Sequence, residues 1–348
     1  MDYNILQTLC NIPSPSGREQ DAVNYVESVL PKADTIYKDK IGNRAFYYGS
    51  GPVKILLSAH IDEVCARVTY ISDDGILSII STGGICKKSL IASHVQILSD
   101  NGTLFNGIVE KTPIHCEEGA DKDEVEEIHE FKVNLGYDSK EDVESLGIHV
   151  GSIVIYKRDC DVNFGDKKIC GCAMDDKAGI FICLRIIQQL VHYKSTWDKK
   201  YTVIFLAATQ EETGLRGAKV AASAINPDIS IDFDVTFACN NGRGVKREKY
   251  GNIKLGEGGV IQFGPDKSER LNSILIDAAE HNDIKYQRGV SRAGGTNTSA
   301  IQLAAADCET TLISIPNKDM HTPVELVSKD DIESIISLVS LVIEKNLL

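Results

Sequence analysis

An apolar stretch that ends in two adjacent glutamates constrains the fold of this chain more than any other feature. Residues 201–208 are almost all apolar, which predicts a strand buried on both faces. Residues 215–222 are rich in alanine and favour a helix. Glu211 and Glu212 therefore fall where a strand of an α/β sheet leads into a helix, the edge at which such sheets bind ligands. Because adjacent carboxylates repel each other, a metal ion is the compensation we favour, and a solvated acidic loop is the alternative.

Length and charge exclude several classes of protein. The chain has 348 residues, more than one domain usually holds, so two units are expected. A net charge of −13 argues against a nucleic-acid partner, because no basic stripe is present to meet phosphates. No apolar run approaches the ~20 residues of a membrane span, and the first residues do not resemble a signal peptide. The 10 cysteines, several of them inside apolar runs, predict reduced thiols and a cytoplasmic location.

A second strand ends in a histidine. The nearly all-apolar run 53–59 predicts a central strand, and it leads directly into His60 and Asp62. A carboxylate that accepts the proton of the far ring nitrogen orients a histidine for metal binding, which is the arrangement we expect of this pair.

Upstream, Ser16 with Glu19 three residues later predicts a capping box at the start of the first helix.

Acidic residues also interrupt or precede other predicted elements. Asp175 and Asp176 stand at the amino end of an apolar helix predicted over 177–193, where helix capping accounts for one aspartate but not readily for two. Asp234 lies within a strand predicted over 229–238, and a buried carboxylate there is costly unless it is paired or bound to a metal.

The last third of the chain adds a histidine and a terminal helix. His321 follows a strand predicted over 310–316. The terminal helix is predicted to begin at Ser328 with Asp331 in the capping position.

Residues 66–163 have a different character from the rest of the chain. Short alternating β runs are separated by turn signals such as Asn101-Gly102, and the acidic segment 117–131 reads as a solvated loop. This pattern predicts a small barrel or sandwich. The predicted architecture is a three-layer α/β/α catalytic domain with a mainly parallel sheet, formed by residues 1–65 and 164–348. A small β-barrel-like domain is inserted at 66–163.

Six residues capable of metal chemistry lie at the predicted strand and helix ends. They are His60, Asp175, Glu211, Glu212, Asp234 and His321. Two histidines and four carboxylates suit Zn²⁺, Co²⁺ or Mn²⁺. With one shared carboxylate, such a set can hold two ions about 3.5–4 Å apart and leave one carboxylate as a general base for water.

Several motifs resemble those of one family, the M42 metallo-aminopeptidases. They are AHIDEV, MDDKAG, TQEETGLRGA, DVTFA, GGTNTSAIQ and MHTPVELVS, and they occur in family order across nearly the whole chain. FNGIVEKTPIH and LGIHVGSIV resemble the β domain inserted in that family.

The resemblance implies a role for each residue and a reaction. It makes Asp175 the bridge between two metal ions, with His60 and Asp234 at one ion and Glu212 and His321 at the other. Glu211 becomes the general base, and Asp62 orients His60. The implied enzyme is a dinuclear metal-dependent aminopeptidase, in which a metal-bridged hydroxide hydrolyses the N-terminal peptide bond of short peptides. Zinc is the favoured metal, with cobalt or manganese as alternatives.

The resemblance also implies assembly. Members form large homo-oligomers of twelve subunits, often through the inserted domain, which restricts entry to short peptides. The chain departs from the family at Lys177 and Asn297, where arginine and aspartate are common, and it lacks the Asp-x-Pro that often follows Asp234. These departures leave the preferred N-terminal residue open.

Two other functions are weighed against the aminopeptidase. A glycoside hydrolase could use two of the carboxylates, but carbohydrate clefts usually present aromatic platforms and the only tryptophan, Trp197, lies outside every motif. That reaction would also leave His60 and His321 without a purpose. A non-catalytic homologue would have lost a ligand or the base, and none is lost.

Overall fold

The computed structural model describes residues 1–116, 126–239 and 245–348 and divides into two compact units. The first unit consists of residues 1–62, 160–320 and 324–348, and the second of residues 63–159 and 321–323. Part of the predicted acidic loop, residues 117–125, lies outside the described residues, as do Asn240, Asn241 and Gly242 of the segment after Asp234.

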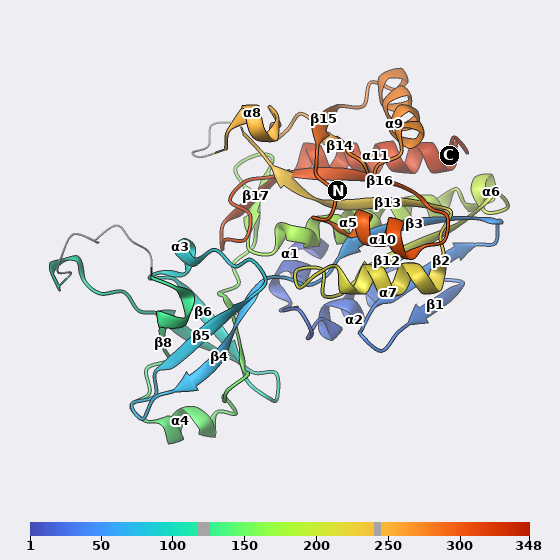
Figure 1. Cartoon of the computed structure of the whole chain (residues 1–348). Helices are drawn as coiled ribbons and strands as arrows, with labels where there is room; N and C mark the ends of the chain where they lie inside the picture. The colour runs from blue at the N-terminus through green and yellow to red at the C-terminus, as the bar shows by residue number, and fades with distance from the viewer. Residues whose placement is uncertain (117–125, 240–244) are drawn as a thin grey trace. The chain divides into compact units, whose positions relative to one another are not determined.

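The first unit is built on a sheet of eight strands (Figure 1). In spatial order they are β1 (Thr35–Lys38), β2 (Arg44–Gly49), β12 (Tyr201–Ala208), β3 (Val53–His60), β13 (Ile229–Phe237), β16 (Glu309–Asn317), β14 (Gly259–Phe263) and β15 (Tyr286–Val290). The four central strands from β12 to β16 are parallel to one another, which confirms the prediction of a mainly parallel sheet. A small antiparallel sheet holds β10 (Asp161–Phe164), β11 (Lys168–Gly171) and β17 (Glu325–Ser328).

Helices cover both faces of the eight-stranded sheet. One face packs against α1 (Asn4–Asn11), α2 (Gln20–Val29), α5 (Met174–His192), α9 (Glu269–His281) and α11 (Lys329–Glu344). The other face packs against α7 (Arg216–Ile225) and α10 (Asn297–Ala304). The short helices α6 (Lys194–Trp197) and α8 (Arg247–Tyr250) complete this unit. The three-layer α/β/α arrangement follows from these two cores.

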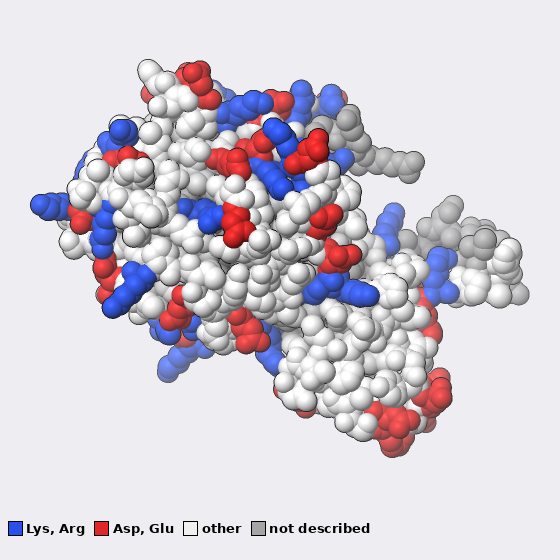
Figure 2. All heavy atoms as spheres, turned by 180° about the vertical axis from the view of Figure 1, so that it is seen from behind, with Lys and Arg blue, Asp and Glu red and all other residues white. Residues whose placement is uncertain are grey.

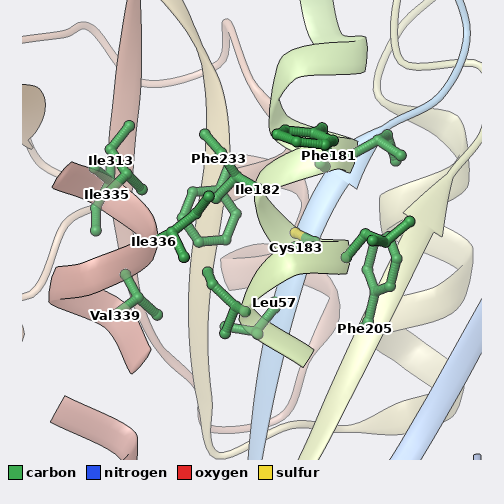
Figure 3. Close-up of a cluster of buried hydrophobic side chains, with 14 of the residues drawn as sticks. Leu57, Phe181, Ile182, Cys183, Phe205, Phe233, Ile313, Ile335, Ile336 and Val339 are labelled. Carbon is green, nitrogen blue, oxygen red and sulfur yellow. The ribbon is translucent and has the colours of Figure 1, made fainter. Parts of the chain in front are cut away.

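The larger core lies between α5 and the sheet, as Figure 3 shows. Phe181 and Ile182 of α5 are fully buried and belong to the same apolar cluster as Phe205 and Phe233 of the sheet. Burying one such side chain contributes roughly 1.5–3 kcal/mol. Because α5 is apolar nearly all round, it can pack on the sheet and on α11 at the same time.

The second unit is a closed antiparallel barrel. Its strands, in order around the barrel, are β4 (Cys65–Ile71), β5 (Leu77–Thr82), β8 (Lys132–Asn134), β7 (Leu104–Val109), β6 (His94–Leu98) and β9 (Ile153–Tyr156). The helices α3 (Lys87–Leu90) and α4 (Lys140–Ser145) lie in the connections, with 3₁₀ turns at Ile114–Cys116 and Ile128–Glu130. Alternation places Val95 and Ile97 inside, fully buried, which confirms the predicted barrel.

Two predicted helix caps are wrong, those of Ser16 and Asp331. Helix α2 begins at Gln20, and the Ser16 hydroxyl donates to Asp62 Oδ2 at 2.6 Å instead of capping a helix. Helix α11 follows Ser328 as predicted, but Asp331 is fully buried and accepts hydrogen bonds from Gly256 N and Gly258 N. In both cases the side chain finds a tertiary partner that competes with the local cap.

Surface charge and helix composition are the features on which the predictions about nucleic acid and membranes depend. On the face shown in Figure 2, Lys and Arg side chains are interspersed with Asp and Glu, as expected for a chain of net charge −13. Among the residues that the structure describes, no helix has both the length and the apolar composition needed to cross a bilayer.

Candidate metal centre

Three adjacent parallel strands bring their carboxyl ends together. His60 is the last residue of β3, the Glu211–Glu212 turn follows β12, and Asp234 lies near the end of β13. Strand β3 is hydrogen-bonded to both of the others. Because parallel strands end at the same edge, residues 174 positions apart in the chain become neighbours there.

His60 lies at the centre of the cluster and is 1% exposed. Its Nε2 lies 2.9 Å from Asp175 Oδ1, and its Nδ1 lies 3.1 Å from the backbone oxygen of Asp62. The Asp62 carboxylate is also near, with Oδ1 3.5 Å from His60 Nδ1. A proton on Nδ1 is therefore directed to Asp62, which leaves Nε2 as the nitrogen that faces the carboxylates.

Asp62 holds the turn that carries the two glutamates. It is fully buried, and its Oδ1 accepts a hydrogen bond from Glu211 N at 2.9 Å, while Oδ2 accepts one from Glu212 N at 3.2 Å. The same Oδ2 accepts the hydroxyl of Ser16. Asp62 therefore contacts both His60 and the backbone of Glu211 and Glu212. The sequence predicted only the first of these contacts.

Both aspartates at the start of α5 have partners from other elements. Asp176 is fully buried, and its Oδ2 accepts a hydrogen bond from His60 N at 3.3 Å while its Oδ1 accepts Gly179 N at 3.0 Å. Asp175 N donates to Glu325 Oε2 at 2.9 Å, and the peptide bond between the two aspartates is cis. Asp176 thus ties β3 to α5, which accounts for the second aspartate that capping left unexplained.

Burial and mutual repulsion shift the protonation of this cluster. Burial raises the pKa of Glu211 to about 9, and the carboxylates of Asp234, Glu212 and Asp175 add to the shift while His60 opposes it. Burial, with Asp175, raises the pKa of Asp234 to about 8. Burial opposes protonation of His60, but the surrounding carboxylates, Glu211 first, outweigh it and raise the pKa of the imidazole. Several carboxyl groups thus lie close together in a region of low dielectric, where their ionised forms are disfavoured.

The donor atoms are near enough to share a cation. One ligand atom from each of His60, Glu211 and Asp234 lies within 4.8 Å of the others, and the same holds for His60, Asp175 and Glu212. An imidazole nitrogen and several carboxylate oxygens are the donors that zinc, cobalt and manganese accept. A bound cation would also favour the ionised carboxylates that burial disfavours. The residues therefore fit the metal ions that the motifs imply.

The structure brings together five of the six predicted metal-site residues, namely His60, Asp175, Glu211, Glu212 and Asp234. The sixth, His321, belongs to the second unit, where its Nδ1 lies 2.9 Å from the backbone oxygen of Gly84. A side chain at position 84 would place its Cβ 3.0 Å from that nitrogen, so glycine leaves room for the ring. The role of His321 as a ligand stays a prediction.

Sequence reasoning missed Glu325 as part of this region. Its side chain is 2% exposed, and its Oε2 accepts the backbone N–H of Asp175 and, at 3.4 Å, the side-chain amide of Asn317. Glu325 stands in the motif MHTPVELVS, four positions after the predicted ligand His321, so the motif that carried His321 could have identified it.

Comparison with known proteins gives a consistent family. A family model described as M42 glutamyl aminopeptidase matches residues 42–338. The chain is 29% identical to the lysyl aminopeptidase of Pyrococcus furiosus, over 99% of this chain and 97% of that protein. The solved structure of aminopeptidase APDkam598 from Desulfurococcus kamchatkensis matches with a TM-score of 0.89 at 31% identity, covering 98% of this chain and 94% of that chain. The TET1 peptidase of Pyrococcus horikoshii, which can assemble into a tetrahedron or a large octahedral shell, matches with a TM-score of 0.85 at 28% identity over 97% of each chain.

Proposed function

Because this chain belongs to the M42 glutamyl aminopeptidase family, as its motifs predicted, we propose that it hydrolyses the N-terminal peptide bond of short peptides with two divalent metal ions. The observation that supports this most is the clustering of His60 with four carboxylates at one edge of the sheet. Similarity to named aminopeptidases over nearly the whole chain supports the same activity.

The proposed ligands follow the roles that the family resemblance implies. Asp175 would contact both ions, and the remaining ligands would be His60, Asp234, Glu212 and His321. When bound, the ions would polarise the scissile carbonyl and lower the pKa of water toward ~7. Zinc is the metal we favour, with cobalt or manganese as alternatives, because the donor set contains both nitrogen and oxygen.

Glu211 is the proposed general base. It would accept a proton from the attacking water as the oxygen adds to the carbonyl carbon, and it would give that proton to the amine nitrogen as the C–N bond breaks. Its side chain is 8% exposed, so little bulk water competes for the proton. Asp62 would keep His60 and the backbone of Glu211 in place through the contacts described above.

The experiment that tests this function is removal and return of the metal. Dialysis against EDTA should abolish hydrolysis of aminoacyl-anilides, and Zn²⁺, Co²⁺ or Mn²⁺ should restore it at about two ions per subunit by elemental analysis. A glycoside hydrolase would keep its activity on a soluble glucan without metal, and a non-catalytic homologue would bind metal without turnover. Either of those results would contradict the proposal.

The inserted unit is the proposed site of assembly. Assembly as a homo-oligomer, in the form of a dodecamer, is supported by the TET1 peptidase, for which a dodecamer and a tetrahedron are described. A closed shell would admit peptides and exclude folded proteins. Light scattering should give a mass many times that of the chain, and a monomer would contradict this part. The cytoplasmic location stays a prediction.

A further inference from the structure

The segment between α1 and α2 is bonded to the turn that follows β3. Ser14 donates its hydroxyl hydrogen to the backbone oxygen of Ile61 at 2.7 Å, and Ser16 donates to Asp62 Oδ2 at 2.6 Å. Both serines are buried. Residues 14–19 therefore contact the backbone and the side chain that immediately follow His60.

The same segment is bonded to the turn that follows β12. Glu19 is 4% exposed, and its Oε1 accepts hydrogen bonds from Gly17 N at 2.8 Å and from Gln210 N at 3.2 Å. Gln210 has a φ of 55°, in the left-handed region that non-glycine residues rarely adopt. A residue in that conformation stays there only when its surroundings hold it, and Glu19 supplies one of the contacts that do so.

Two carboxylates accept hydrogen bonds from the backbone of residues 210–212, the turn that carries the proposed base. Glu19 accepts the N–H of Gln210, while Asp62 accepts the N–H groups of Glu211 and Glu212. Three consecutive N–H groups are thus fixed by side chains from two distant parts of the chain. Ser16 links the two acceptors, because it lies in the segment of Glu19 and bonds to Asp62.

We propose that Ser16 and Glu19 are positioning residues for the Glu211 carboxylate. They hold the backbone of residues 210–212 so that the base meets the attacking water in one orientation. The inference rests on the proposed function, because it takes Glu211 as the base. Both residues precede the span 42–338 that the family model matches.

Removal of the Glu19 carboxylate should disturb catalysis more than folding. Glu19 lines a surface pocket of about 340 Å³ together with Arg18 and Lys40. Truncation of Glu19 should extend this pocket to the position of Oε1, which lies 3.2 Å from Gln210 N, so that water can replace the lost acceptor. Water does not fix the direction of the N–H, however, and a displacement of about 1 Å at a catalytic group can cost about 100-fold in rate.

The test compares Glu19→Ala with Glu19→Gln and with Asp21→Asn as the matched control. Asp21 is exposed and lines the same pocket. In the metal-loaded enzyme, Glu19→Ala should lower kcat about 10- to 100-fold and leave KM and metal content within about twofold. Glu19→Gln should recover most of the rate, because its amide oxygen can accept the same two N–H groups. Asp21→Asn should match the parent.

A second readout does not depend on activity. Hydrogen–deuterium exchange of the peptide that covers residues 209–215 should be about tenfold faster in Glu19→Ala and unchanged in Asp21→Asn. Should Glu19→Ala fail to fold, Ser16→Ala takes its place, with the exposed Ser28→Ala on α2 as its control. The expected effects are the same in direction.

The proposal is overturned by an unchanged kcat in both Ser16→Ala and Glu19→Ala, or by a Glu19→Gln variant as slow as Glu19→Ala. It is also overturned by unchanged exchange of residues 209–215. A parent enzyme that hydrolyses no aminoacyl-anilide with any of the three metals contradicts the proposed function instead. In that case faster exchange in Glu19→Ala still supports the role of Glu19 in holding the turn.

Discussion

The carboxyl edge of the central sheet and the amino end of α11 both bury carboxylates, but they compensate them differently. At α11, Asp331 accepts backbone N–H groups from Gly256 at 2.8 Å and Gly258 at 2.7 Å. At the sheet edge, Glu211, Asp234 and Asp175 lie close to one another around a single histidine. Burial raises the pKa of a carboxyl in both places, so burial by itself does not mark a metal site. The convergence of several carboxylates on one imidazole is what distinguishes the sheet edge from α11.

The second unit shows a third kind of compensation. Glu63 is 5% exposed and forms an ion pair with Arg158, at 2.6 Å between Oε1 and Nη2. A guanidinium with parallel donors can satisfy a buried carboxylate without a metal. The three regions therefore predict three different responses when a carboxylate is changed.

The largest expected effect is at the sheet edge. Replacing Glu211 with glutamine keeps the size of the side chain but removes the base, so kcat should fall about 10²- to 10⁴-fold. Metal content should stay unchanged, because Glu211 is not among the proposed ligands. Aminoacyl-anilide kinetics and elemental analysis measure both, with the exposed Glu269→Gln on α9 as control. A variant as fast as the parent would remove Glu211 from the mechanism.

The ion pair of the second unit should give the largest effect on stability. Glu63→Ala removes the carboxylate of a buried ion pair, and breaking such a pair costs roughly 3–5 kcal/mol of unfolding free energy. The control is Glu144→Ala, whose exposed pair with Lys140 on α4 should be worth about 0.5 kcal/mol or less. Urea unfolding followed by circular dichroism measures both. Equal losses in the two variants would show that burial does not distinguish these pairs.

The smallest expected effect is a dependence on pH at α11. Burial raises the pKa of Asp331 to about 7, although the N–H groups of Gly256 and Gly258 and the charge of Lys168 oppose it. Because the folded-state pKa lies above the unfolded value, the contribution of this group is full below about pH 4 and is lost as pH rises through about 7. Between pH 5 and pH 8 the parent should lose about 3 kcal/mol through this group.

Asp331→Asn should not show that part of the pH dependence, because an amide does not titrate. Its stability relative to the parent should therefore improve as pH rises, measured by urea unfolding at pH 5 and pH 8. The neighbouring Asp330→Asn is the control, since Asp330 is partly exposed and paired with Lys167. Parallel pH profiles for the parent and Asp331→Asn would contradict the assignment.

Strongly patterned elements could be predicted from the sequence, and weakly patterned ones could not. The strand β12 has the predicted bounds, Tyr201–Ala208, because an apolar run between polar residues has few other solutions. The helix α1 and the edge strand β1 were missed. Edge strands face solvent, as the exposed side chains of β1 do, and so lack the apolar run that identifies a central strand.

Side chains that act through tertiary contacts were the least predictable. Ser16 and Asp331 both fit a local capping pattern, yet each bonds to a residue far away in the chain. Glu19 was interpreted only as part of a capping box, yet it accepts the N–H of Gln210 next to the proposed base. Glu325 carried no recognised role, yet it accepts the N–H of the proposed ligand Asp175. A local sequence pattern predicts hydrogen-bond partners that are near in the chain. It does not predict a partner that comes near only when the chain folds.

The sequence by itself determined the class of fold, the inserted barrel and the chemical character of the site, because periodicity and residue type are local properties. Only the tertiary structure decided which carboxylates meet His60 and which backbone groups Asp62 and Glu19 accept. The physical reason is the parallel sheet: it places strand ends side by side that lie up to 174 residues apart in the chain.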